Sequence, residues 1–168
     1  MTFDNYIERE IKFAERSSSP LSLILITTIQ INADIESEEQ ASIDKPFIFS
    51  IAVKKARRAL RATDTIVLNK GRDILIVLPC TDEHGAQLVS DKIKAEMEPE
   101  FEKIKSDLKE YIYPVHVTYP YDGDSFQALM HKAFMQVSSK ELLEKIVSIP
   151  TDTLNYANKS YSRYQRLI

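Results

Sequence analysis

Two apolar patterns alternate along the chain and predict helices and strands in turn. Near the amino terminus, apolar residues recur at helical spacing among charged ones, which predicts a helix from about Phe3 to Arg16. The polar run Ser17–Pro20 should end this helix. The next segment, Leu21–Ile31, is almost continuously apolar and rich in branched residues, so we expect a strand that is covered on both faces.

The middle of the chain combines a helical pattern with a hairpin pattern. Residues Asn32–Lys45 are polar and poorly periodic, which predicts an irregular loop. Pro46 then suits the first turn of a helix that runs to about Leu60. Two short apolar runs, Thr65–Asn69 and Asp73–Pro79, are separated by a tight charged connection and predict a β-hairpin.

Helix and strand patterns keep alternating in the carboxyl-terminal half. Asp82 is typical of a helix N-cap, and the apolar stripe after it predicts a helix that ends near Met97. A separate helix is expected over Glu100–Lys109. The remaining elements are a strand and a final helix, at Tyr111–Pro120 and Ser125–Val147.

This order of elements predicts an α+β domain with an antiparallel-rich sheet flanked by helices. Pro114 lacks an N–H group, so its strand should lie at an edge of the sheet or contain a bulge. The last residues, Thr151–Ile168, are polar and tyrosine-rich, which indicates a loosely docked tail. We therefore expect one domain at residues 1–148 and a tail at residues 149–168.

Composition narrows the classes of partner. The chain of 168 residues has a formal net charge of −3, so its overall charge favours neither nucleic acid nor a membrane surface. No apolar run approaches the roughly 20 residues of a membrane span, and no secretory core is present, which predicts a cytoplasmic protein. The single cysteine, Cys80, excludes an internal disulfide and is expected to be buried.

The most specific signal surrounds the hairpin. Arg61-Ala62-Thr63-Asp64 is followed by five residues, then by Lys70-Gly71-Arg72-Asp73, and then by an apolar strand that ends in Leu-Pro. This arrangement resembles GGDEF (diguanylate cyclase) domains, in which an RxxD pair, five residues and the GGDEF turn follow one another. The segments Pro20–Ile26 and Val117–Ala133 resemble the family's first strand and its late strand, turn and helix. The resemblance covers about Phe3 to Val147 and implies the cyclase-palm fold.

The resemblance also implies an active site in which carboxylates hold Mg²⁺ for phosphoryl transfer between two GTP molecules. Here Thr27 occupies the carboxylate position of the first strand, and Arg72 occupies the metal-ligand position of the hairpin. Lys70 replaces the first glycine of the turn, while Gly71 and Asp73 are kept. Because one carboxylate cannot assemble a two-metal site, we predict an inactive homologue with no catalytic residues, no metal and no cofactor.

A second site of the family is kept in sequence. In the family, the RxxD pair forms an inhibitory site that binds cyclic di-GMP, and Arg61 and Asp64 match it. An arginine can hold a phosphate or stack on guanine, and a carboxylate can accept hydrogen bonds from guanine N1 and N2. Lys92 falls at the position of a second cation, and Arg57 and Arg58 lie one turn before the motif. These five residues are the predicted cyclic di-GMP contacts.

Both motif residues also have an ordinary structural explanation. Arg61 is expected near a helix C-terminus, where the helix dipole favours a cation, and Asp64 is expected where a turn leads into a strand. The sequence alone leaves this choice open.

Three functions are therefore open at this point. The chain is a receptor for cyclic di-GMP, a protein-interaction or scaffold domain that needs no nucleotide, or a cyclase with residual activity. For the second function, the candidate surfaces are the amphipathic amino-terminal helix and the tail tyrosines Tyr156, Tyr161 and Tyr164, which would bind a protein partner or a second copy. The sequence begins with Met and shows no preceding sensor domain, so we expect a signal received directly or within a complex.

Overall fold

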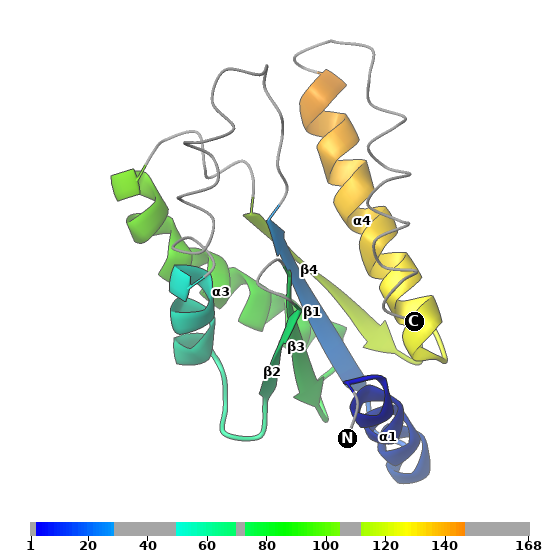
Figure 1. Ribbon diagram of the computed structural model, residues 1–168. Coiled ribbons are helices and arrows are strands. Elements are labelled where there is room, and N and C mark those ends of the chain that lie inside the picture. The colour runs from blue at the N-terminus through cyan, green and yellow to red at the C-terminus, as the bar shows by residue number, and fades with distance from the viewer. Residues whose placement is uncertain (1–2, 29–49, 70–72, 105–111, 147–168) are drawn as a thin grey trace.

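The computed structural model describes residues 3–28, 50–69, 73–104 and 112–146 (Figure 1). The helices and strands with defined bounds are α1 (Phe3–Ser17), β1 (Leu21–Thr28), β2 (Thr65–Asn69), β3 (Asp73–Pro79), α3 (Glu83–Ile104), β4 (Ile112–Tyr119) and α4 (Phe126–Ile146). Residues 50–59 form a further helix between β1 and β2. The expected alternation of helices and strands is therefore present, and α1, β2, β3, β4 and α4 begin and end within one residue of their predicted bounds.

The sheet is antiparallel throughout its described pairs. Its strand order is β2-β3-β1-β4, with β1 and β3 in the centre. β4 is an edge strand, as Pro114 predicted, and Pro114 lies opposite Ile26 of β1. An edge position has no ladder partner on one side, so it tolerates a residue without an N–H group. The α+β class and the antiparallel sheet are thus confirmed.

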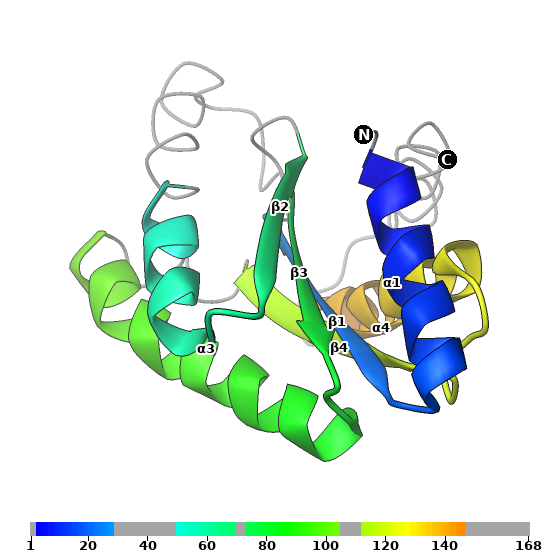
Figure 2. The same ribbon diagram turned by 90° about the horizontal axis from the view of Figure 1, so that it is seen from below.

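Helices cover both faces of the sheet. Figure 2 shows α1 and α4 on one side of it, and α3 with the helix of residues 50–59 on the other. Successive residues of a strand point to opposite faces, so β1 contributes to both cores. Leu23 and Leu25 pack toward α1 and α4, whereas Ile24 and Ile26 pack toward the other pair of helices. This confirms the prediction of a strand covered on both faces.

Local capping explains where two helices begin and end. At the end of α1, Ser18 has a left-handed backbone (φ 49°), and the N–H of Ser19 donates to the carbonyl of Ala14 at 3.0 Å. This is the Schellman pattern that closes many helices. At the start of α3, Asp82 Oδ1 accepts a hydrogen bond from the N–H of Gly85 at 2.8 Å, which confirms the predicted N-cap.

The expected break between two helices near Met97 is wrong. α3 is one helix that continues through Pro99 to Ile104. A proline inside a helix removes a hydrogen bond and costs about 3 kcal/mol, so the local sequence opposes a continuous helix at Pro99. Met97 is buried just before the proline, and Glu100 just after it pairs with Lys55 at 3.1 Å. These contacts hold both sides of the proline against the domain, so tertiary packing outweighs the local preference.

The expected burial of Cys80 is also wrong, because this residue is exposed. β3 ends at Pro79, which is the last residue paired with β1, and the chain then turns toward α3. Cys80 takes a left-handed backbone in this turn (φ 50°) and lies beyond the sheet that would have covered it.

Some predictions fall outside the described residues. These are the end of the first strand at residues 29–31, the loop and helix start at residues 32–49, the extension of the Glu100 helix beyond Ile104, and the tail with its boundary at residue 148. Within the described residues, no helix is long and apolar enough to cross a membrane.

Candidate functional site

The RxxD motif forms a closed turn between a helix and the edge strand. The helix of residues 50–59 ends just before it, and β2 begins at Thr65, directly after Asp64. The N–H of Asp64 donates to the carbonyl of Arg61 at 3.1 Å, which is the hydrogen bond of a four-residue turn. The N–H of Arg61 donates in return to Asp64 Oδ2 at 2.7 Å. The structure therefore brings the two motif residues together through their backbones.

This arrangement gives Asp64 a structural role that is independent of any ligand. A short carboxylate side chain commonly satisfies a nearby backbone N–H in this way. The bond occupies Oδ2, and among the described residues Oδ1 accepts no hydrogen bond. One face of the carboxylate thus closes the turn while the other is available, so the structural explanation for Asp64 and the binding explanation are compatible.

Arg61 differs from Asp64 in this respect. Its side chain is exposed, and its guanidinium forms no hydrogen bond or ion pair within the described part of the chain. Arg57 and Arg58, on the preceding helix, are exposed in the same way, whereas Lys55 turns inward to Glu100. The turn is therefore approached by a helix that presents several unpaired cations to solvent.

Lys92 is less closely placed. It is exposed on α3, which covers the same face of the sheet as the helix of residues 50–59. Within the described residues, no hydrogen bond or ion pair joins it to Arg61 or Asp64. The structure therefore keeps Lys92 on the same side of the molecule but shows no direct contact with the motif.

The charge beside Lys92 is partly offset by its neighbour Asp91. The hydrogen bond from Gln87 Nε2 to Asp91 Oδ1 (2.9 Å) lowers the pKa of this carboxyl. Lys94, whose Nζ lies 3.6 Å from Asp91 Oδ1, lowers that pKa further, while partial desolvation opposes the shift. Because Asp91 stays ionised, α3 attracts an anion less strongly than the helix of residues 50–59 does.

The positions of the family's active site meet at the opposite end of the β2–β3 hairpin from the RxxD turn. Thr27 of β1 and Asp73 of β3 are paired residues in adjacent strands, and Asp73 is also paired with Asn69 of β2. The Asp73 side chain is buried, with 3% of its surface exposed. Lys70, Gly71 and Arg72 lie outside the described residues. Across the described ranges, no three His, Cys, Asp or Glu side chains lie together as metal ligands would.

Sequence reasoning missed one contact next to the motif. The hydroxyl of Tyr6, on α1, donates to Thr65 Oγ1 at 3.0 Å, and Thr65 is the residue that follows Asp64. The two residues are 59 positions apart in the chain. No short motif links them, so only the folded structure reveals the contact.

Among the comparisons with known proteins, only the one with solved structures gives matches. No protein-family model matches the sequence, and no curated protein matches it. Among solved structures, the chain is similar to the GGDEF domain of PA1120 (YfiN or TpbB) from Pseudomonas aeruginosa, with 20% identity, a TM-score of 0.59, and coverage of 83% of this chain and 88% of that one.

Two further structures give the same result. A DGC protein from Thermotoga maritima matches with 12% identity and a TM-score of 0.55, over 77% of this chain and 90% of that one. A sensory box/GGDEF family protein from Caulobacter crescentus matches with 15% identity and a TM-score of 0.52, over 82% and 88%. The chain therefore has a GGDEF-type fold, as the resemblance of its sequence to that family implied.

Proposed function

We propose that this domain is a catalytically inactive GGDEF-like signalling domain that binds cyclic di-GMP at the Arg61–Asp64 turn. The observation that supports this most directly is the geometry of the turn. Its carboxylate is fixed by a 2.7 Å bond to the backbone while Oδ1 and the Arg61 guanidinium are unoccupied among the described residues. An acceptor and a forked cation thus belong to one turn, in which the Arg61 side chain is exposed.

The chemistry of cyclic di-GMP suits such a pair. Each guanine carries N1 and N2 donors on one edge, which a carboxylate oxygen can accept, and each phosphate carries one negative charge. A guanidinium can bind a phosphate with two hydrogen bonds or stack on the base. Arg57, Arg58 and Lys92 would add attraction for the phosphates without needing direct contact.

Replacing Arg61 by alanine is the test of this proposal. Losing charge-assisted hydrogen bonds of about 1.5–3 kcal/mol is expected to weaken binding by roughly 10-fold to 100-fold. Isothermal titration calorimetry with cyclic di-GMP, on wild type and Arg61→Ala side by side, measures the change. Lys12→Ala is the matched control, because Lys12 is an exposed cation on α1, on the other face of the sheet.

A second variant separates binding from folding. Asp64→Asn keeps an oxygen that can accept the N–H of Arg61, but it places an amide donor where the guanine donors would lie. We expect this variant to keep its melting temperature and lose affinity. The proposal fails if wild type gives no heat at high micromolar ligand, or if Arg61→Ala binds as well as wild type.

Catalytic inactivity is the other half of the proposal. It is supported by the threonine at position 27, which pairs with Asp73 where the family has a carboxylate, and by the arginine at position 72 of the turn. We expect no cyclic di-GMP after incubation with GTP and either Mg²⁺ or Mn²⁺, assayed by chromatography beside an active diguanylate cyclase. Product formation that scales with protein concentration would overturn this half.

A protein-interaction role through the amphipathic helix α1 is less well supported by the fold. The apolar face of α1 is already used inside the domain, because Ile7, Ile11 and Ala14 are buried against the sheet and α4. The tail tyrosines lie outside the described residues, so a partner that binds there stays a prediction. Binding of such a partner would be unaffected by Arg61→Ala and by added dinucleotide.

A further inference from the structure

A hydrogen bond between α1 and β2 lies next to the turn of Arg61 and Asp64, and it comes from the other side of the sheet. Tyr6 donates its hydroxyl hydrogen to Thr65 Oγ1 at 3.0 Å, in a partly buried position. Tyr6 packs with the core beneath α1 and α4, whereas the turn of Arg61 and Asp64 follows the helix on the opposite face. Thr65 connects the two, because it accepts the hydrogen bond from Tyr6 and directly follows Asp64 in the chain.

The position of Thr65 in the sheet explains why an extra contact is needed there. β2 is an edge strand of five residues, and the pair formed by Thr65 and Val77 is the last one in its register. The terminal pair of a short edge strand opens most easily, because it has a neighbour on one side only. If Thr65 leaves the sheet, the turn before it loses its fixed end.

Tyr6 is itself held firmly. The adjacent Ile7 is completely buried, and Ile11, one turn later, is also buried, so α1 is anchored to the sheet. The guanidinium carbon of Arg9 lies 5.3 Å from the centroid of the Tyr6 ring, within the range of a cation–π contact. The tyrosine hydroxyl is thus presented from a supported ring on an anchored helix.

We propose that Tyr6 is a positioning residue of the dinucleotide site, which acts by fixing Thr65 and so the carboxylate of Asp64. This inference rests on the proposed function, because it assigns a further residue to the same site. The turn is closed by two internal bonds, from the N–H of Arg61 to Asp64 Oδ2 and from the N–H of Asp64 to the carbonyl of Arg61. The hydrogen bond from Tyr6 to Thr65 then fixes the position of this closed turn relative to the rest of the domain.

Ligand binding at the turn should in return affect the contact between Tyr6 and Thr65. Because coupling between two parts of a protein is reciprocal, a ligand that orders the turn would stabilise the contact with α1. The amino-terminal helix is thereby connected to the site, although no residue of α1 contacts the motif itself among the bonds described.

A double-mutant cycle tests the inference. Tyr6→Phe removes only the hydroxyl and keeps the ring beneath Arg9, and Thr65→Val keeps the branched shape of the strand residue. Each single variant is expected to weaken cyclic di-GMP binding about threefold to tenfold, and the double variant no more than either one. Tyr121→Phe is the control, because the side chain of Tyr121 is 83% exposed and should not matter.

Hydrogen exchange supplies a readout that does not need the ligand. The amide protons of Arg61 and Asp64 both lie in the turn's internal bonds, so they report directly on its order. In Tyr6→Phe without ligand, we expect faster exchange at these two amides and unchanged exchange at Leu23 in the central strand. A global loss of stability would instead raise exchange at all three.

The outcomes separate this inference from the proposed function. Unchanged exchange at the two turn amides, or additive effects of the two substitutions on affinity, would overturn the positioning role of Tyr6. If wild type does not bind cyclic di-GMP while the exchange at the turn still depends on Tyr6, the binding proposal fails and the support of the turn by α1 stands.

Discussion

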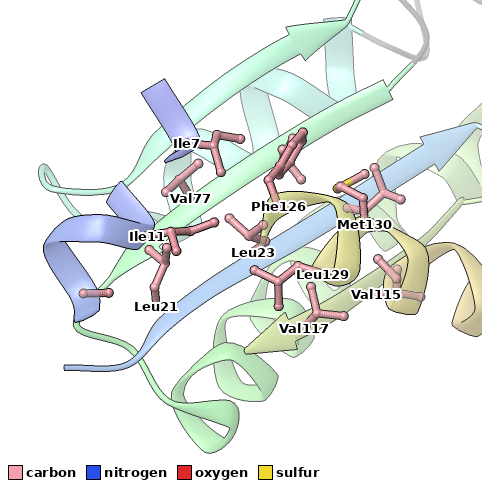
Figure 3. Close-up of a cluster of buried hydrophobic side chains, with 14 of the residues drawn as sticks. Ile7, Ile11, Leu21, Leu23, Val77, Val115, Val117, Phe126, Leu129 and Met130 are labelled. Carbon is pink, nitrogen blue, oxygen red and sulfur yellow. The ribbon is translucent and has the colours of Figure 1, made fainter. Parts of the chain in front are cut away.

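Leu23→Ala should lower the free energy of unfolding by about 3 kcal/mol, within the range of about 2–5 kcal/mol for buried leucines. Leu23 has no exposed surface and lies in β1, between the two neighbouring strands β3 and β4. Figure 3 shows it in the cluster of buried side chains that α1 and α4 share with the sheet, with Ile11 and Leu129 in the same cluster. Removing its three outer carbons leaves a cavity that these rigid neighbours cannot fill.

Urea denaturation, followed by circular dichroism, measures this loss. Leu88→Ala is the matched control, since the side chain of Leu88 on α3 is 57% exposed and its truncation should change stability by less than about 0.5 kcal/mol. Equal losses in the two variants would contradict the assignment of β1 as the centre of the core. The comparison also bears on the proposed loss of catalysis, because Thr27 of β1 is paired with Asp73 of β3. A stable central strand keeps these two positions next to each other.

The central strand shows why so much of the fold could be predicted. A nearly continuous apolar run has to be covered on both faces, and only a central strand of a layered domain satisfies this requirement. Leu25 and Ile26 confirm it, because they are buried in different clusters on the two faces. The hairpin could be predicted equally well, because two short apolar runs joined by a tight connection can pair with each other in few other ways.

The wrong prediction of a helix break has a different cause. The sequence predicted a helix end near Met97, but burial of Met97 and the ion pair between Lys55 and Glu100 hold the helix together through Pro99. Both contacts join α3 to segments that are distant in sequence or in another layer. Tertiary packing of this kind can override a local preference. A prediction that uses only local sequence does not include these contacts.

The candidate site was predictable in its residues but not in its support. The spacing of Arg61 and Asp64 was visible in the sequence, and the structure shows that they share one closed turn. The contact of Tyr6 with Thr65 joins residues 59 positions apart, and no periodicity or motif indicates it. Lys92 was placed by counting along the chain, and its role at the site stays a prediction, because no described contact joins it to the motif.

The second large effect is expected at a buried polar network beside the start of α3. Ser22 is fully buried, and its hydroxyl lies 2.8 Å from both the carbonyl of Thr81 and the hydroxyl of Thr118. These bonds join β1, β4 and the segment that leads into α3. Because Ser22→Ala would leave buried partners unsatisfied, we expect it to lower the free energy of unfolding by about 2 kcal/mol.

Ser90→Ala is the informative comparison for this prediction. Ser90 is equally buried, with 1% of its surface exposed, but its hydroxyl has no hydrogen-bond partner among the described residues. Removing an unsatisfied buried hydroxyl of the same size should be neutral or stabilising, by up to about 1 kcal/mol. The two substitutions delete the same atom from equally buried serines, so opposite effects in urea denaturation would isolate the contribution of the hydrogen bonds. Equal effects would show instead that burial alone decides the cost, and that the network does not hold α3, with its Lys92, to the sheet.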